Sequence, residues 1–231
     1  NLPPDTLKRE HLMGRLEATQ AMHNPKNWEE QKEARRRTAF EELFFMQAGI
    51  LLLRKKRESH VMSIKCAPSG KLVQSVLDNF PFHLTAGQQQ AFSDIEDDME
   101  GLIPMQRLIQ GDVGSGKTAV AALALAKIVE NGYQGALMAP TEVLAGQHYR
   151  TFQEFYKGLP IHVAYLSGQT KTKERNEILK GLKDGSIDVL IGTHALIEED
   201  VVFAHLGLVI TDEQHRFGVK QRKALETKGG Y

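Results

Sequence analysis

The run GDVGSGKT, Gly111–Thr118, has the composition and spacing of a phosphate-binding loop. It fits the pattern G-x-x-x-x-G-K-[S/T], in which glycines let backbone N–H groups turn toward phosphate oxygens and the following helix presents its positive end to them. Lys117 would neutralise the β and γ phosphates of a nucleoside triphosphate, and the Thr118 hydroxyl would coordinate Mg²⁺. A flexible turn with an incidental lysine is the alternative. The nucleotide-binding candidates here are Gly111, Asp112, Val113, Gly114, Ser115, Gly116, Lys117 and Thr118.

Two adjacent carboxylates, Asp212 and Glu213, close the apolar stretch LGLVITDE. Ends of parallel strands face the ligand crevice of an open sheet, so we expect this pair to meet the phosphate loop. Asp212 would hold Mg²⁺, commonly through water, and Glu213 would polarise the water that attacks the γ-phosphate. The pair could instead cap the next helix. Beside a phosphate loop, hydrolysis of a nucleoside triphosphate is favoured, with Lys117, Asp212 and Glu213 as catalytic candidates and Thr118 and Asp212 as metal ligands.

The adenine end of such a nucleotide also has a candidate. Gln88 lies one helical turn beyond Thr85, a residue type that caps helices, and an amide can pair bidentately with the N6/N7 edge of adenine. A capped surface helix in which Gln88 has no special role is the alternative.

The elements that must position these residues alternate between strand and helix after about residue 100. Short apolar runs predict strands, and amphipathic spacing predicts the helices between them. This alternation requires parallel pairing with right-handed crossovers, hence a doubly wound α/β sheet. The predicted strands are 106–110, 136–139, 162–166, 189–192 and 208–211, and the predicted helices are one opened by Thr85, 118–131, 142–156, 173–184 and 194–198.

The first part of the chain has a different pattern. Residues 28–60 contain no proline, only Gly49 and mostly helix formers, which predicts one long helix; residues 69–79 predict a shorter one. We expect the charged first half of the long helix to project into solvent or to lie against another domain, and the runs 35–37 and 54–57 to form a solvated face. Its second half carries an apolar stripe formed by Leu43, Phe44, Met46, Ile50, Leu51 and Leu53.

Composition excludes several classes of protein. Of 231 residues 41% are hydrophobic and 25% charged, which fits a soluble globular chain, and no apolar run approaches the roughly 20 residues of a membrane span. The single cysteine excludes an internal disulfide framework and fits a reducing cytosol, and zinc-type Cys/His spacing is absent. Basic and acidic residues are equal at 29 each, so any nucleic-acid partner must be argued locally.

Taken in order, LTAGQ, GDVGSGKT, MAPTEVLAGQH, IGTHALI and DEQHRFGVKQR resemble the motif series of superfamily 2 helicases. GDVGSGKT with DEQHRFGV, and RLEATQAMHNP near the start, are similar to the RecG family of branched-DNA helicases. The resemblance spans nearly the whole chain. It implies an α/β fold: a RecA-like P-loop domain over residues 79–231, with a parallel sheet sandwiched by helices, preceded over residues 1–78 by a long-helix linker to a wedge domain.

The resemblance also implies an activity: ATP-dependent remodelling of stalled forks and Holliday junctions in DNA recombination and repair, with ATP and Mg²⁺, in the bacterial cytoplasm at the nucleoid. It makes Gln88 the adenine reader and agrees with the roles given to Lys117, Thr118, Asp212 and Glu213. His215, which closes the DEQH box, would couple the nucleotide state to DNA, or would simply pack in a helix start. The DNA-backbone motifs correspond to Pro140, Thr141, Glu142, Gln147, Gly192, Thr193 and His194, although helix capping explains each singly as well.

A basic cluster follows one predicted strand. Lys171, Lys173 and Arg175 lie in the segment SGQTKTKERNE, where they would either contact DNA phosphates or form a solvated helix start, which is the favoured interpretation.

The chain departs from the family pattern at both ends. From the resemblance we expect a wedge domain upstream and, after DEQH, a threonine-rich coupling motif and a second RecA-like domain whose arginines reach the γ-phosphate. These 231 residues contain none of the three, and their start resembles that of an excised piece. We therefore expect weak ATP binding, hydrolysis slowed on the order of 10³ to 10⁵-fold, and no unwinding by the chain alone. A sheet cut short in this way would also expose an edge and apolar surface.

Two other functions stay open: a non-hydrolysing nucleotide-binding or DNA-docking module, and an unrelated P-loop phosphotransferase. The absence of a recognisable acceptor or lid segment speaks against the phosphotransferase. The partners expected from the resemblance are branched DNA, as a fork or four-way junction, and no membrane, with action as a monomer. The sequence leaves open whether a single-strand DNA-binding protein docks here.

Overall fold

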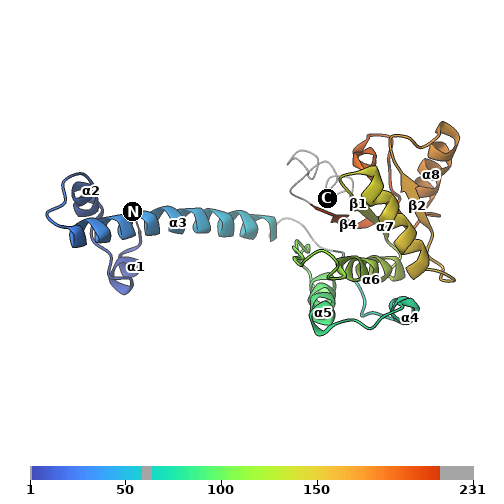
Figure 1. Cartoon of the computed structure of the whole chain (residues 1–231), viewed down its shortest axis with the longest axis horizontal. Helices are drawn as coiled ribbons and strands as arrows, with labels where there is room; N and C mark the ends of the chain where they lie inside the picture. Colours follow the sequence, from blue (N-terminus) through green and yellow to red (C-terminus); the bar gives the residue numbers. More distant parts are fainter. Residues whose placement is uncertain (1, 59–63, 214–231) are drawn as a thin grey trace. The chain divides into compact units, whose positions relative to one another are not determined.

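The computed structural model describes residues 2–58 and 64–213 of the chain. Contacts divide the chain into two units, Asn1–His60 and Val61–Tyr231 (Figure 1). The division into a linker over residues 1–78 and a RecA-like domain over residues 79–231 stays a prediction. No helix within the described ranges is long and apolar enough to cross a membrane.

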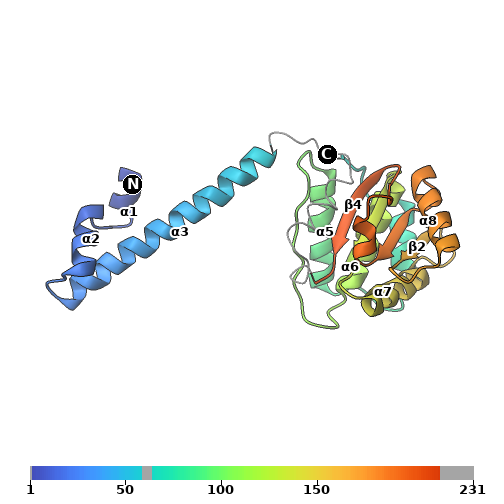
Figure 2. The same cartoon turned by 90° about the horizontal axis from the view of Figure 1, so that it is seen from above.

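The first unit consists of three helices, α1 (Pro4–Arg9), α2 (Arg15–His23) and α3 (Trp28–Glu58). Ala18 and Ala21 of α2 pack against Ala34 of α3, and their small side chains let the two helices approach closely, side by side in both views (Figure 1 and Figure 2). The sequence predicts α3 correctly but neither α1 nor α2. Both are short, and helices of this length depend on packing more than on intrinsic propensity.

The charged first half of α3, expected to project into solvent or to lie against another domain, packs against α2 within its own unit. Arg37 is buried, with its Nε donating to the carbonyl oxygen of Met13 at 3.1 Å and Nη1 paired with Glu41 at 2.6 Å. The expectation that the run 35–37 is a solvated face is therefore wrong for Arg37, while Arg35 is exposed. The apolar stripe in the second half is uncovered by the described residues: the side chains of Leu43, Met46, Ile50, Leu51 and Leu53 are all exposed.

The second unit is built on a four-stranded parallel sheet with the strand order β2-β3-β1-β4. This confirms the α/β architecture, with most predicted elements displaced by a residue or two. Its elements in chain order are α4 (Lys71–Asn79), α5 (Ala86–Glu100), α6 (Lys117–Glu130), β1 (Gln134–Met138), α7 (Glu142–Phe155), β2 (Val163–Leu166), α8 (Thr172–Asp184), β3 (Val189–Gly192), η1 (His194–Ile197) and β4 (Leu206–Thr211).

Helices cover both faces of this sheet. Because successive side chains of a strand point to opposite faces, Val189 and Ile191 of β3 pack with α4, α5, α6 and α7, whereas Leu190 packs on the other side with α8 and Phe203. In Figure 1, α4, α5 and α6 lie below the sheet and α8 lies above it. All of β1 and β3 is buried, as expected for strands covered on both faces.

Two predicted elements are corrected. Residues 106–110, expected to be a strand, run directly into the phosphate loop but belong to no strand of the described structure. Apolar composition predicts burial, yet a strand also requires a backbone partner, and here Leu108 is exposed while Ile109 alone packs on the core. The helix predicted over 194–198 is the short 3₁₀ turn η1.

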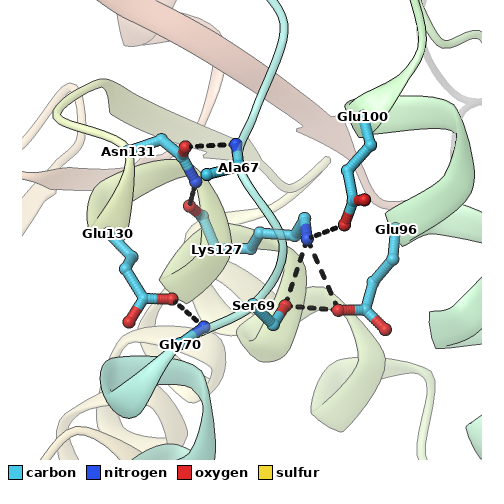
Figure 3. Close-up of polar contacts among 8 residues, drawn as sticks. All are labelled: Ala67, Ser69, Gly70, Glu96, Glu100, Lys127, Glu130 and Asn131. Carbon is cyan, nitrogen blue, oxygen red and sulfur yellow. Dashed lines mark hydrogen bonds and ion pairs between the residues drawn. The ribbon is translucent and has the colours of Figure 1, made fainter.

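A buried lysine fastens the segment before α4 to two helices of the second unit. Lys127 on α6 is fully buried, and its Nζ donates to Glu100 Oε1 at 2.7 Å, to Ser69 Oγ at 3.2 Å and to Glu96 Oε1 at 3.4 Å (Figure 3). We call these four residues the Lys127 cluster. Ser69 also donates to Glu96. A buried ammonium requires such paired and hydrogen-bonded surroundings, since desolvation alone would be strongly unfavourable.

The end of α6 adds further bonds to the same segment. Glu130 accepts the backbone N–H groups of Gly70 and Leu72, both at 2.7 Å, and Asn131 Oδ1 accepts that of Ala67, also at 2.7 Å. These bonds satisfy backbone donors just before and at the start of α4, where no capping side chain is present. The segment 67–72 is thereby fixed against α5 and α6.

Replacing Lys127 tests this fastening. Lys127→Met keeps the apolar stem and removes the ammonium, so we expect a loss of about 3 kcal/mol in the free energy of unfolding, the lower end for a broken buried pair because Glu96 and Glu100 keep some contact with water. Urea unfolding measures it. The matched control Lys183→Met, at an exposed lysine of α8, should change the free energy by less than about 0.5 kcal/mol. Equal effects in both variants would show that the cluster contributes nothing.

Candidate functional site

The carboxyl ends of the strands meet at one edge of the sheet because the pairing is in register. Met138 of β1 pairs with Gly192 of β3 and with Thr211 of β4, and Leu166 of β2 also pairs with Gly192. The residues that follow each strand therefore start from one line. This edge carries the predicted carboxylates and both predicted DNA-backbone motifs, as expected for an open parallel sheet.

The phosphate loop has the backbone that its glycines allow. Gly114 and Gly116 have φ angles of +82° and +77°, which L side chains rarely adopt, and the Ser115 N–H donates to the Asp112 carbonyl oxygen at 3.1 Å to close the turn. Helix α6 begins directly after Gly116, so its first N–H groups point toward the loop. Nine buried residues anchor this helix in the core. This arrangement of N–H groups at a helix start is typical of sites that bind anions.

Lys117 holds its ammonium inside this loop. Its Nζ donates to the carbonyl oxygens of Gly111 at 2.6 Å and Asp112 at 2.8 Å. These contacts keep the charge beside the backbone N–H groups of the loop. Thr118, the second residue of α6, is half-buried next to it.

Gln88 is joined to the phosphate loop. Its Oε1 accepts the Thr85 N–H at 2.8 Å and its own N–H donates to Thr85 Oγ1 at 3.3 Å, which completes a capping box at the start of α5. Its Nε2 donates to the Ser115 carbonyl oxygen at 2.8 Å. A Cβ on Gly116 would lie only 2.2 Å from that Nε2. The capping interpretation is therefore confirmed, and Gln88 also contacts the loop; its role as the adenine reader stays a prediction.

Asp212 lies opposite the loop at the end of β4. Its N–H donates to the Met138 carbonyl oxygen at 2.9 Å, and its Oδ2 lies 2.7 Å from Nε2 of His148 on α7. The hydrogen bond from His148 is the main cause that lowers the pKa of the Asp212 carboxyl, against burial, and the charge of Lys117 adds to it. A lowered pKa keeps the carboxylate ionised, so the stabilisation from this pair is present above the unfolded pKa and is lost only as pH falls through the folded one.

Glu213 follows with a φ angle of +46°, a left-handed conformation unusual for a residue with a side chain. Such strain is frequent at functional sites, and the Glu213 side chain is exposed at the sheet edge. His215 lies outside the described residues.

The first predicted DNA-backbone motif surrounds the start of α7. Thr141 is the N-cap and accepts the Leu144 N–H at 3.3 Å; its side chain is exposed, as is that of Gln147, while Pro140 and Glu142 are half-buried. Helix capping therefore explains Thr141, and its exposure leaves it available to a ligand as well.

The second predicted DNA-backbone motif follows β3. Gly192 has a packing reason, because a Cβ there would lie 1.9 Å from the Leu166 carbonyl oxygen. Thr193 is buried, and its Oγ1 has no hydrogen-bond partner within the described part of the chain. His194 is exposed. A buried hydroxyl without a partner is unfavourable by about 1–3 kcal/mol. The Thr193 hydroxyl therefore has hydrogen-bonding capacity left for another group.

Of the three cations in the basic cluster, Arg175 is engaged within the protein. It pairs with Glu198 at 2.7 Å and Asp200 at 2.8 Å, and these partners raise its pKa, most strongly through the bond to Asp200. Lys171 and Lys173 are exposed. The favoured interpretation, a solvated helix start, fits the two lysines, while Arg175 ties α8 to the loop after η1.

The residues present fit a site in which Mg²⁺ is bound jointly by protein oxygens and by the phosphates of a nucleotide. Within residues 2–58 and 64–213 no group of three or more His, Cys, Asp or Glu side chains could hold a metal. Mg²⁺ is usually bound by one or two protein oxygens together with phosphates and waters, so Thr118 with Asp212 is a sufficient donor set.

Sequence reasoning overlooked one residue of this site. His148 contacts Asp212, yet it appeared only as the last letter of the motif MAPTEVLAGQH. A signal was present: His148 follows the helix-capping Thr141 by about two turns, which places both residues on one face of α7 at the sheet edge.

Comparison with known proteins agrees with this geometry. The family described as DEAD/DEAH box helicase matches residues 85–228. The ATP-dependent DNA helicase RecG of Thermotoga maritima is 50% identical over 99% of this chain, and that of Synechocystis sp. is 45% identical over 99%. The chain spans 29% and 27% of the length of these two relatives.

A solved structure also shows similarity to RecG. The structure of RecG bound to a three-way DNA junction is 48% identical, with a TM-score of 0.84, over 94% of this chain and 30% of that chain. The structure of the DUF1998 helicase MrfA bound to DNA and AMPPNP has a TM-score of 0.52 at 18% identity. It covers 66% of this chain and 22% of that one, and the likeness shows the fold alone. The match to DEAD/DEAH proteins implies the use of ATP. The chain therefore belongs to the DEAD/DEAH box helicases of superfamily 2 and, within them, to the RecG family.

Proposed function

We propose that this chain is the ATP-hydrolysing motor part of a helicase that remodels branched DNA, such as forks and four-way junctions, in recombination and repair in the bacterial cytoplasm. One observation carries the proposal: the ammonium of Lys117 is held in the glycine loop by the carbonyl oxygens of Gly111 and Asp112, and the carboxylate of Asp212 follows β4 at the carboxyl edge of the same sheet. A cation for phosphate and an acid for metal on facing elements are the parts that triphosphate hydrolysis requires.

The nucleotide would be held along the edge from α5 to β4. Gln88 would pair with adenine, the loop N–H groups and Lys117 would bind the phosphates, and Thr118 with Asp212 would hold Mg²⁺, which when bound neutralises charge on the β and γ phosphates. Glu213 would accept a proton from the attacking water. The exposed position of Glu213 beside Asp212 supports this role.

DNA would bind through its backbone beside the nucleotide. Exposed Thr141, Gln147 and His194 can donate to phosphates without reading sequence, and the buried Thr193 hydroxyl could gain a partner when the motif rearranges. We expect Pro140, Glu142 and Gly192 to shape these contacts, and His215 to couple them to ATP. Support for a branched substrate comes from the relative, which was solved on a three-way junction. We expect the protein to act as a monomer.

Removing the phosphate cation and the base should have different effects. In the protein as its own cell produces it, Lys117→Ala should abolish ATP binding and turnover, because the phosphates lose their cation. Glu213→Gln should retain binding while turnover falls about 10²- to 10⁴-fold. Turnover is measured with and without three-way junction DNA. The controls Lys183→Ala and Glu199→Gln, at exposed side chains, should match the unmodified protein. ATP binding without any turnover on DNA would favour a non-hydrolysing docking module instead.

The fit between Gly116 and Gln88 gives a second test. Gly116→Ala and Gly132→Ala each place a side chain at a positive φ, +77° and +80°, so both should lose about 1–2 kcal/mol of stability. A Cβ at Gly132 meets nothing within 4 Å, whereas at Gly116 it displaces Gln88. Nucleotide affinity should fall about tenfold or more in Gly116→Ala alone, since a bidentate base contact is worth about 1–3 kcal/mol, and the preference for ATP over GTP should fall with it. An unchanged preference for ATP over GTP in Gly116→Ala would contradict an adenine role for Gln88, because an altered loop backbone lowers the affinity for both nucleotides equally.

A further inference from the structure

His148 is a partly buried titratable residue to which the proposed mechanism gives no role. It lies on α7, its side chain is 15% exposed, and its Nε2 lies 2.7 Å from Oδ2 of Asp212, whose side chain is 29% exposed. At this distance the contact is a short hydrogen bond to an ionised acceptor, the stronger kind of hydrogen bond. It joins two motifs that are far apart in the sequence.

The contact fixes the direction of the Asp212 carboxylate. The backbone of Asp212 is held by its bond to the Met138 carbonyl oxygen at 2.9 Å, but that bond leaves side-chain rotation open. The His148 bond on Oδ2 removes this freedom. A carboxylate has two oxygens with about four acceptor positions, so capacity remains for a metal-bound water. Groups that orient a ligating carboxylate in this way commonly set the affinity of the metal.

Helix α7 links this bond to the part of the edge proposed to touch DNA. Thr141 caps the helix, Gln147 immediately precedes His148, and a single helical rod carries all three. Buried Phe152 and Phe155 seat the other end of α7 in the core. A shift or rotation of the start of α7 would therefore move the imidazole relative to the end of β4.

We propose that His148 is a positioning residue that orients Asp212 for magnesium and makes that orientation depend on the placement of α7. The inference rests on the proposed function, in which Asp212 holds Mg²⁺ and the residues at the start of α7 contact DNA. In this arrangement a phosphate bound at Thr141 or Gln147 influences the nucleotide site through one side chain.

The test compares two substitutions in the natively expressed protein. His148→Phe keeps a ring and removes the donor, whereas His148→Gln places an amide N–H near the position of Nε2. The control His162→Phe removes another histidine paired with an aspartate, Asp188 at 3.2 Å, at the amino end of β2 and away from the phosphate loop. Binding of a fluorescent, non-hydrolysable ATP analogue is titrated with Mg²⁺ and also measured in excess chelator.

We expect His148→Phe to raise the Mg²⁺ concentration needed for tight analogue binding by about 10- to 100-fold, the range for partners of metal ligands, with the metal-free affinity unchanged. His148→Gln should recover most of the loss, and His162→Phe should match the unmodified protein. Stimulation of ATP turnover by three-way junction DNA should fall in His148→Phe and recover in His148→Gln.

Other outcomes would overturn the inference. One is an unchanged Mg²⁺ requirement for analogue binding in His148→Phe, and another is an equal rise of that requirement in His148→Phe and His148→Gln. A third is an affinity in excess chelator that falls in His148→Phe by the same factor as the affinity in Mg²⁺, which would indicate a purely structural role. Failure of the proposed function is recognised separately. If the unmodified protein binds the analogue without any dependence on Mg²⁺, or if Lys117→Ala does not weaken this binding, both the function and this inference are wrong.

Discussion

The parallel pairing of β2, β3, β1 and β4, whose register is continuous toward the carboxyl ends of the strands, is the constraint on which the rest of the site depends. Because Met138, Leu166, Gly192 and Thr211 end level with one another, the segments that follow them emerge at one edge. A slip of one residue in β4 would turn Asp212 to the opposite face and out of reach of His148. Register is in turn fixed by apolar side chains that pack on both faces of β1 and β3.

The phosphate loop is held by parts on either side of it. Behind it, α6 is anchored by its buried apolar residues and by the Lys127 cluster, and beside it Gln88 ties the start of α5 to Ser115. Helices α5 and α6 thus contact the loop at their starts and share the Lys127 cluster toward their ends (Figure 3). Anion binding by backbone N–H groups needs such rigidity, because preorganised groups lose little entropy when the ligand arrives.

Much of this could be predicted from the chain itself. The phosphate loop, the Asp212–Glu213 pair, the Thr85 cap and most of the helices and strands follow from local chemistry, since glycine at a positive φ, capping hydroxyls and apolar periodicity act over a few residues. The errors have one cause: strand pairing and burial depend on contacts with segments far away along the chain, which local composition does not specify. Residues 106–110 have the composition of a strand but not its place in the sheet, and Arg37 belongs to a charge run but is buried against Met13.

The amino-acid sequence by itself determined the motif residues, the α/β class and the family resemblance, because these depend on residue type and spacing. Only the tertiary structure decided which residues meet: His148 with Asp212, Lys127 with Glu96 and Glu100, and Arg175 with Asp200. Each pair joins segments far apart along the chain, and charge or hydrogen-bonding capacity alone does not choose among the available partners. The choice is made by the packing of helices on the sheet, which brings particular side chains within about 3 Å of one another.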